Sequence, residues 1–409
     1  MHRTFYLIKT IFIFLLLFFS YQTLISNNFS YMGFVNSFSL SRSIPALFFT
    51  FLLLVTLSFV ISPFSKFVAS LFLIFVVFPN VALYCSMGGD WRIVLWSILC
   101  IPITLIIFNF FPKIKFIVLK DKQVSILLWS LLVICLIPVL LAHGVRFNLS
   151  VFYLDVYDVR RESRLSNTML SVYGYFWLAK VICPIGLVYA IERKKILMVI
   201  TFICVLFYLF MTTGHKSVFF TVILIFVMYK GGEDFIKKNN YLLNGAVLLF
   251  CISIILTQVF NVITFESLFI RRLLFIPALL NTYYFDFFNG KFVYYSSSYF
   301  SMFLDYPYDR PIPEVIGLNY YNSEEMSANN GYISDGFANL GDIGVFINII
   351  MGALILKIFK DYNVSPKYAG LIFVLFYAIQ GSAMSTVLLT HGGILMLFLV
   401  PMVLRRNNV

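Results

Sequence analysis

Long apolar stretches separated by short polar links recur along the whole chain of 409 residues. A helix needs about 20 apolar residues to cross the hydrocarbon layer of a bilayer, and most of the stretches come near that length. We therefore predict an all-α, polytopic integral membrane protein with about twelve membrane-spanning helices. The predicted spans are 5–25, 44–61, 67–86, 91–111, 124–142, 172–191, 196–211, 218–229, 241–260, 343–359, 368–388 and 392–404.

These spans divide the chain into five segments. Helices 1 to 5 lie within 1–142, helices 6 to 9 within 172–260, and helices 10 to 12 within 343–409. An outer loop is predicted at 143–171 and a larger one at 261–342. The early part of the larger loop is amphipathic, so we expect a helix there that lies on the membrane surface.

Composition places the protein in a bilayer rather than in water. Apolar residues make up 61% of the chain and charged residues only 12%, against about 25% charged residues in a soluble domain. The net charge of +12 is spread between apolar runs, which argues against a nucleic-acid-binding face. The six cysteines occur singly, and no zinc-binding spacing is present. We therefore expect no metal and no other cofactor.

The distribution of lysine and arginine predicts the orientation. If both termini are cytoplasmic, most basic residues fall on short inner links, whereas the outer side is nearly neutral and carries both large loops. Cytoplasmic loops of membrane proteins are enriched in lysine and arginine. We therefore expect both termini in the cytoplasm and the bulk of the polar chain outside.

Basic residues on the predicted outer side occur in clusters. Arg160, Arg161 and Arg164 lie close together in the first loop, and Arg271 and Arg272 are adjacent in the second. Guanidinium groups match phosphate oxygens in geometry, so these clusters favour a diphosphate-binding site, although pairing with nearby carboxylates is an equal alternative. The candidate diphosphate-binding residues are Arg161, Arg164, Lys216, Arg271 and Arg272.

Three of the four histidines, His143, His215 and His391, lie at predicted outer ends of spans, and two of them are candidate bases. His215 and Lys216 belong to the stretch 212–217, which connects two short apolar runs. Short neighbouring helices suggest that their connection lies below the outer surface, in a recess lined by protein; snorkelling of the lysine to the interface is the alternative. His391 ends another span. For either histidine, a ring bonded to backbone is as good an explanation as a catalytic base.

The larger loop combines aromatic and polar residues. Between 281 and 342 it holds ten tyrosines interleaved with asparagine and serine, a composition that suits both sugar faces and the membrane interface. Its glycine-rich end predicts a tight turn before a helix start, with Asp335 and Asp342 aimed at whatever the loop covers. Asn330, Gly331 and Arg310 are the candidate contacts of an acceptor.

With these features the chain resembles the O-antigen polymerases, the oligosaccharide repeat-unit polymerases of the Gram-negative inner membrane, which are related in architecture to the O-antigen ligases. The resemblance covers the number of spans, the large outer loop and the outer arginines. Its local motifs are Asp158-x-Arg160 with Arg164, the stretch 212–217, where relatives often have Gly-Ser-Arg, and the run 330–344. Lys216 stands where an arginine is frequent.

The resemblance implies a reaction and its partners. Undecaprenyl-diphosphate-linked repeat units would be donor and acceptor, within membrane lipids and with a chain-length regulator as a candidate partner. The transfer would invert the anomeric centre and release undecaprenyl diphosphate. His215, Asp335 and His391 are the candidate catalytic bases, and the clustered cations would stabilise the leaving group.

Two alternatives stay open at this point. An O-antigen ligase, or another transferase that uses lipid-linked sugars, would have the same residues. A lipid-linked oligosaccharide flippase would carry charges inside many spans, whereas Lys180 is the main charge inside a predicted span.

Overall fold

The computed structural model describes residues 2–113, 117, 119–145, 156–231 and 234–404, and all regular structure within these ranges is helical. Ten helices there are long and apolar enough to span a membrane. The prediction of an all-α, polytopic membrane protein is therefore confirmed. The ten spans are Arg3–Asn28, Leu40–Ser58, Pro63–Met87, Trp91–Phe110, Asp121–His143, Met169–Glu192, Ile196–Thr213, Phe235–Phe260, Tyr332–Asp361 and Met384–Val403.

Two of the twelve predicted spans are too short to cross a bilayer as single helices. Helix α12, Lys216–Lys230, has 15 residues, and helix α17, Ala369–Gly381, has 13, against about 20 needed. The apolar run at 368–388 looks continuous in sequence, but the helix breaks after Gly381, a residue type that commonly ends helices. Its last part, α18, belongs to the final span.

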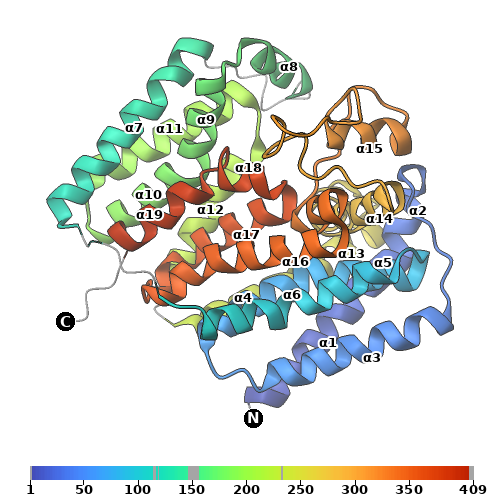
Figure 1. The fold of residues 1–409 in the computed structure, drawn as a ribbon. Coiled ribbons are helices and arrows are strands. Elements are labelled where there is room, and N and C mark those ends of the chain that lie inside the picture. The colour runs from blue at the N-terminus through green and yellow to red at the C-terminus, as the bar shows by residue number, and fades with distance from the viewer. Residues whose placement is uncertain (1, 114–116, 118, 146–155, 232–233, 405–409) are drawn as a thin grey trace. The chain divides into compact units, whose positions relative to one another are not determined.

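The chain forms two compact units, each assembled from separate stretches (Figure 1). Unit 1 comprises Met1–Phe111, Asp234–Leu354 and Ile379–Met384, and unit 2 comprises Pro112–Glu233, Ile355–Ala378 and Ser385–Val409. The helices of unit 1 are α1 (His2–Ser20), η1 (Tyr21–Ile25), α2 (Ser26–Asn28), η2 (Ser30–Met32), α3 (Leu40–Ser58), α4 (Pro63–Phe72), η3 (Leu73–Val77), α5 (Phe78–Met87), α6 (Trp91–Phe110), α13 (Phe235–Phe260), η6 (Glu266–Phe275), α14 (Ile276–Phe288), α15 (Ile312–Tyr321) and the first part of α16 (Tyr332–Asp361).

Unit 2 holds the remaining helices. They are α7 (Asp121–His143), α8 (Val156–Ser166), α9 (Met169–Trp177), η5 (Leu178–Ile182), α10 (Cys183–Glu192), α11 (Ile196–Thr213), α12, the end of α16, η7 (Pro366–Tyr368), most of α17, nearly all of α18 (Met384–Leu388) and α19 (Gly393–Val403). Three of the five boundaries between the units fall inside the helices α16, α17 and α18.

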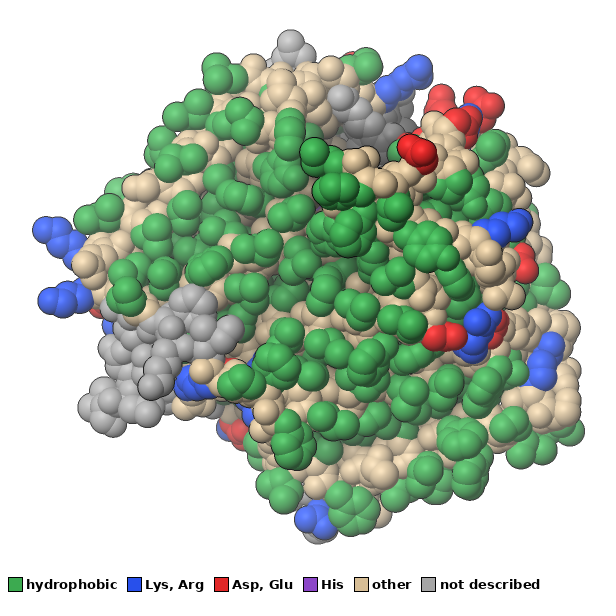
Figure 2. Space-filling view, viewed as in Figure 1, with side chains coloured by type: hydrophobic (Ala, Val, Ile, Leu, Met, Phe, Trp, Pro, Cys, Tyr) green, Lys and Arg blue, Asp and Glu red, His purple; other side chains and the backbone are tan. Residues whose placement is uncertain are grey.

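Each unit is built around one buried span. In unit 1, 89% of an apolar stretch of 18 residues within the span Pro63–Met87 is buried, and α13 and α6 pack on its first half, α4. In unit 2, 78% of an apolar stretch of 18 residues within the span Met169–Glu192 is buried, between α7 and α11. The other spans expose apolar side chains on one face, as Phe48 and Phe51 do on α3. Such side chains cover much of the face in Figure 2, and lipid is the solvent that suits them.

Both central spans contain a π-helical turn followed by proline. η3 precedes Pro79, and η5 precedes Pro184. Proline has no backbone N–H and its ring collides with the carbonyl four residues earlier, so the α-helical ladder opens there. In η3 the freed carbonyl of Phe75 accepts a hydrogen bond from the side chain of Gln380. In η5 the corresponding position is Lys180.

The end of the larger predicted loop is helical. Helix α16 begins at Tyr332, well before the predicted start of the span at 343, and it kinks at Leu340 and Gly341, where the φ of Gly341 is +60°. The glycine- and asparagine-rich stretch was expected to form a turn, but residues 331–339 are buried, and packing overrides their weak helix propensity. The predicted loop therefore ends before Tyr332.

The early part of the same loop is also helical, as predicted, and comprises η6 and α14. Leu279, Tyr284 and Phe285 of α14 are almost fully buried, and the helix packs on α5 and α15. The apolar face of α14 is therefore covered by protein rather than by lipid.

Candidate functional site

Two sequence clusters that are more than 40 residues apart meet at one end of unit 2. Helix α8, which carries Arg160, Arg161 and Arg164, packs on α11 and α7. Its Val159 is buried against Phe210 and Met211, directly before the stretch 212–217. We call this region, formed by α8, the end of α7 and the junction between α11 and α12, the α8 end of unit 2.

The junction between α11 and α12 is a tight turn. Gly214 ends α11 in the left-handed conformation with φ +65°, and its N–H donates to the carbonyl of Phe210. His215 precedes the first residue of α12 and is partly exposed. The hydroxyl of Thr213 lies 2.9 Å from that of Tyr175 on α9, and the rings of Tyr175 and His215 are 6.0 Å apart. The turn is therefore fixed to α9.

Helix α9 connects both predicted histidines of unit 2. Tyr175 lies against His215, and the next residue, Phe176, packs with its ring 4.8 Å from that of His391. The rings of Tyr175 and Phe176 are themselves 5.1 Å apart. His391 is only 7% exposed, whereas His215 is more open. The two candidate bases thus pack against adjacent aromatic residues of α9, but only His215 is partly exposed to solvent.

Among the candidate diphosphate ligands at the α8 end, the structure describes the side chain of Arg161, which is exposed. The side chains of Arg164 and Lys216, both candidate diphosphate ligands, lie outside the described residues, although the backbones of α8 and α12 place their positions at this end. A diphosphate is recognised by several donors at once. The packing of α8 beside the junction brings the positions of basic residues from two segments to the same end of unit 2.

The two candidate arginines of unit 1 have different environments. Arg271 donates to the hydroxyl of Ser267 at 2.6 Å and its guanidinium lies 4.4 Å from the centre of the Phe29 ring. Its Nε is buried and has no hydrogen-bond partner among the described residues. Arg272 is exposed and has no ion pair within the described part of the chain. Arg271 is thus held by the protein, and Arg272 is open to a ligand.

Glu266 lies one turn before Arg271 and is fully buried. It accepts hydrogen bonds from the hydroxyl of Thr257 at 2.9 Å and from the amide of Asn28 at 3.4 Å. Burial raises the pKa of Glu266, and these two hydrogen bonds and the charge of Arg271 offset part of that rise. The carboxyl group joins the start of η6 to α13 and α2.

Asp335 is a buried residue of α16 rather than part of an open loop. Its carboxylate accepts from the backbone N–H of Met384 at 2.9 Å and from the side-chain amides of Asn348 and Asn339 at 3.0 and 3.2 Å. The expectation that Asp335 is aimed at a covered ligand is not met in this geometry, because three protein donors already surround it. A buried carboxyl group with three donors has its hydrogen-bonding needs met by the protein.

Asn330 and Gly331 also make contacts inside unit 1. The Asn330 amide donates to Asn281 at 2.9 Å and to Ser334 at 2.7 Å. A Cβ on Gly331 would lie 2.0 Å from the carbonyl oxygen of Gln380, so only glycine fits there. These two candidate acceptor contacts are therefore used to pack the beginning of α16.

Arg310, the third candidate acceptor contact, lies just before α15. Its Nε is 3.7 Å from the carboxylate of Asp309, and its side chain is 26% exposed. The hydroxyl of Tyr306 donates to its backbone carbonyl. Arg310 is therefore a partly exposed residue with one loose ion-pair partner.

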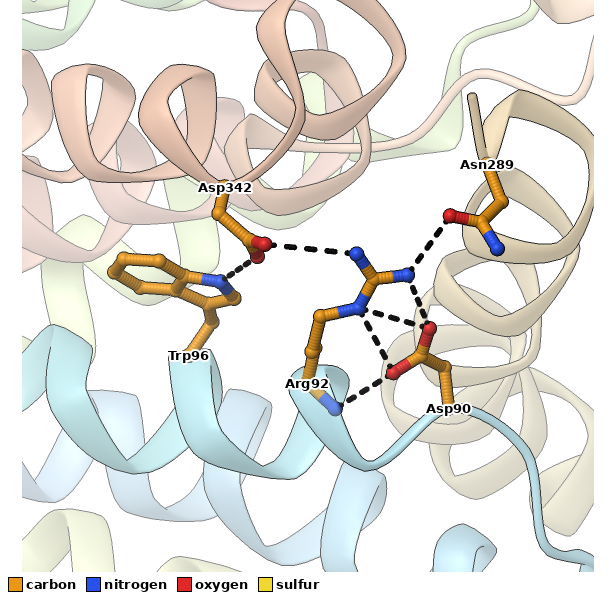
Figure 3. A network of polar contacts seen from close by, with 5 residues as sticks. All are labelled: Asp90, Arg92, Trp96, Asn289 and Asp342. Atoms are coloured by element: carbon orange, nitrogen blue, oxygen red, sulfur yellow. Dashed lines mark hydrogen bonds and ion pairs between the residues drawn. The ribbon is translucent and has the colours of Figure 1, made fainter. Parts of the chain in front are cut away.

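A polar network that the sequence did not reveal surrounds Arg92 in unit 1 (Figure 3). Arg92 donates to both carboxylate oxygens of Asp90 at 2.6 to 3.1 Å and to Asn289 at 3.1 Å. Asp342 lies 3.5 Å from the same guanidinium and accepts from the indole of Trp96. Asp342 is therefore directed at α6. The sequence feature that could have indicated this network is the pair Asp90-x-Arg92 at the start of α6.

No protein-family model, no curated protein and no solved structure matches this chain. Within the described ranges, no three His, Cys, Asp or Glu side chains are grouped so that they could hold a metal ion. The fold defines the class, which is a multi-pass, α-helical membrane protein. Any more specific activity rests on the residues of the α8 end.

Proposed function

We propose that the protein polymerises undecaprenyl-diphosphate-linked oligosaccharide repeat units at the outer face of a bacterial inner membrane. The observation that carries this proposal is the packing of the arginine-bearing helix α8 beside the turn that holds His215. Cations for a leaving diphosphate and a base for an acceptor hydroxyl are the two requirements of such a transfer.

The opposite end of unit 2 supports the orientation in this proposal. There Arg193 pairs with Asp121 at 3.2 Å, and Lys195 donates to Ser125 at 2.6 Å. Lys367 lies over the ring of Tyr229. We call this region the lysine end. Because cytoplasmic ends of spans are rich in lysine and arginine, the lysine end would face the cytoplasm and the α8 end the periplasm.

His215 is the best base among the three candidates. Asp335 is occupied by three protein donors, and His391 is buried behind Phe176. His215 is partly exposed and stands on a turn fixed by Tyr175. A base has to come within hydrogen-bond reach of the hydroxyl that it deprotonates, and only His215 offers that access.

The reaction would run as a single displacement. The acceptor hydroxyl oxygen attacks the anomeric carbon of the donor sugar, the bond from that carbon to the diphosphate oxygen breaks, and His215 takes the hydroxyl proton. The anomeric centre is inverted, and undecaprenyl diphosphate leaves with the bonding electrons. Arg161, Arg164 and Lys216 would stabilise the negative charge that develops on it. Arg271 and Arg272 stay candidates for this role from the sequence alone.

The proposal is tested with the purified protein in proteoliposomes that contain synthetic undecaprenyl-diphosphate-linked repeat unit. We expect a ladder of longer lipid-linked chains and release of undecaprenyl diphosphate. Transfer only to an added lipid A core would identify a ligase instead. Movement of the substrate across the bilayer without new glycosidic bonds would identify a flippase, and both results would overturn polymerisation.

Variants at the two ends of unit 2 locate the reaction. We expect His215→Ala, and Arg161→Ala combined with Arg164→Ala, to reduce the ladder at least 100-fold while the protein stays monodisperse, since a positioned base alone contributes about 10² to 10⁴ in rate. The matched control is Arg193→Ala, which removes an arginine at the lysine end and should leave the ladder intact. Equal losses in all three variants would contradict a site at the α8 end.

A further inference from the structure

Lys180 is an ammonium group within a membrane-spanning segment. It lies in the π-helical turn η5, in the middle of the span Met169–Glu192. Its Nζ is 5.1 Å from the centre of the Phe176 ring, and no carboxylate pairs with it in the described part of the chain. A charge inside the membrane is costly without a counter-charge, and such residues mark functional sites.

His391 faces the same region from the loop between α18 and α19. It is 7% exposed, and its ring Nδ1 is buried and has no hydrogen-bond partner in the part of the chain that the structure describes. Its backbone N–H donates to the carbonyl of Thr386 at 2.8 Å. Such a buried polar atom needs a partner from outside the protein, such as a water molecule or an ion.

The backbone brings the two residues together. Gly392, with φ +76°, lies so close to η5 that a Cβ there would be 2.9 Å from Val181 and 3.2 Å from Trp177. The indole of Trp177 donates to the carbonyl of Leu389 at 2.9 Å. This contact fixes the loop that carries His391 on the turn that carries Lys180. The arrangement is therefore built into the packing of unit 2.

Lys180 and His391 line one small hollow. Its other walls are apolar and include Val181, Val374, Leu375 and Val387. The hollow has room for about one water-sized group. None of the described residues in its walls is acidic, and its two polar wall residues both carry nitrogens that can donate, the ammonium of Lys180 and a protonated ring nitrogen of His391.

We propose that this hollow is a binding site for a small monovalent inorganic anion, of which chloride is the physiological example. An anion neutralises Lys180 and accepts from both nitrogens, whereas a water molecule would leave the charge uncompensated. Phosphate and sulfate are too large for a hollow of this size and are strongly hydrated. Chloride loses its water more readily and tolerates apolar walls. The site takes no part in the proposed glycosyl transfer.

Binding of radioactive chloride to the purified protein in detergent tests the site directly. We expect saturable binding that is lost in Lys180→Met and reduced at least tenfold in His391→Leu. The matched control is Lys122→Met, which removes one lysine from an exposed position at the start of α7 and should bind as the wild type does. Unchanged binding in Lys180→Met, or no saturable binding in the wild type, would overturn the proposal.

Thermal unfolding adds a second measurement that does not depend on the label. At constant sodium concentration, replacing gluconate by chloride should raise the Tm of the wild type and of Lys122→Met, but not the Tm of Lys180→Met. Bromide should act like chloride, while phosphate should not compete. An equal effect of phosphate would show a general oxyanion site, and a wild-type Tm that ignores all anions would show a neutral Lys180; both would contradict a halide site.

Discussion

The hydroxyl of Tyr175 on α9 lies 2.9 Å from that of Thr213, the last residue of α11. Both residues are buried, and together they hold the turn that carries His215 against α9, a helix of the central span. A buried hydrogen bond between neutral groups contributes about 1 kcal/mol to stability. Its larger consequence here is the position of the histidine ring, which the Tyr175 ring supports.

Removal of one hydroxyl from this pair distinguishes an effect on the position of His215 from an effect on the stability of the protein. We expect Tyr175→Phe to lower polymer formation at least tenfold, because the turn loses its anchor, while unfolding in detergent changes by only about 1 kcal/mol. The matched control is Tyr241→Phe, which changes an exposed tyrosine on α13 and should be neutral. If the ladder of Tyr175→Phe equals that of the wild type, the anchor does not position the base.

Asp335 is expected to act in stability rather than in catalysis. In Asp335→Asn the new amide would place a donor opposite the donors of Met384, Asn348 and Asn339, and hydrogen bonds to the carboxyl group would be lost. The free energy of unfolding should fall by about 2 to 4 kcal/mol, which a denaturant titration in detergent measures.

Asp305→Asn serves as the control for Asp335→Asn, because Asp305 is exposed and its substitution should leave unfolding unchanged. A stable Asp335→Asn protein that makes no polymer would instead assign a catalytic role to this carboxylate, in line with the expectation from sequence.

Glu266 predicts a pH dependence of stability. Burial raises the pKa of its carboxyl group in the folded protein above the unfolded value. The neutral form is therefore favoured by folding, so the stabilisation is fully present below the unfolded pKa and is lost as pH rises through the folded pKa. We expect Glu266→Gln to flatten the fall in Tm as the pH rises above the unfolded pKa of the carboxyl group, whereas Glu324→Gln, at an exposed position, should not. A wild-type Tm that rises over this pH range by way of Glu266 would contradict the raised pKa.

Sequence patterns predicted the spans better than the ends of spans. The lengths of apolar runs identified ten membrane-crossing helices, because hydropathy reports directly on transfer into lipid. They failed at 368–388, where a helix break after Gly381 divides an apolar run. They failed again at the start of α16, where burial makes a helix of a sequence rich in glycine and asparagine.

The candidate site was predictable in its residue types but not in its contacts. Clusters such as Arg160 to Arg164 and 212–217 are visible in sequence because charge is rare in this chain. Nothing in the sequence shows that the side-chain amide of Asn330 donates a hydrogen bond to Asn281. The proximity of Lys180 and His391 could not be predicted from the sequence either, because only tertiary packing brings residues so distant in the chain to one hollow.

Gly331 provides a sharp test of the packing assigned to the start of α16. A methyl group there would lie 2.0 Å from the carbonyl oxygen of Gln380 and 2.4 Å from its carbonyl carbon. Because backbone rather than a flexible side chain blocks the space, Gly331→Ala has to move α16 away from the segment that carries Gln380. Overpacking of this kind costs about 1 to 3 kcal/mol or more, so we expect a clear fall in Tm and in membrane abundance.

Gly245→Ala is the matched control, because a Cβ on this glycine of α13 meets nothing within 4 Å. Alanine is favoured over glycine inside a helix by about 1 kcal/mol, so this variant should be as stable as the wild type or slightly more stable. If Gly331→Ala retained the wild-type Tm but lost polymer, Gly331 would lie at a substrate rather than at a packing contact. The two variants therefore decide between the role that the sequence predicted and the role that the contacts assign.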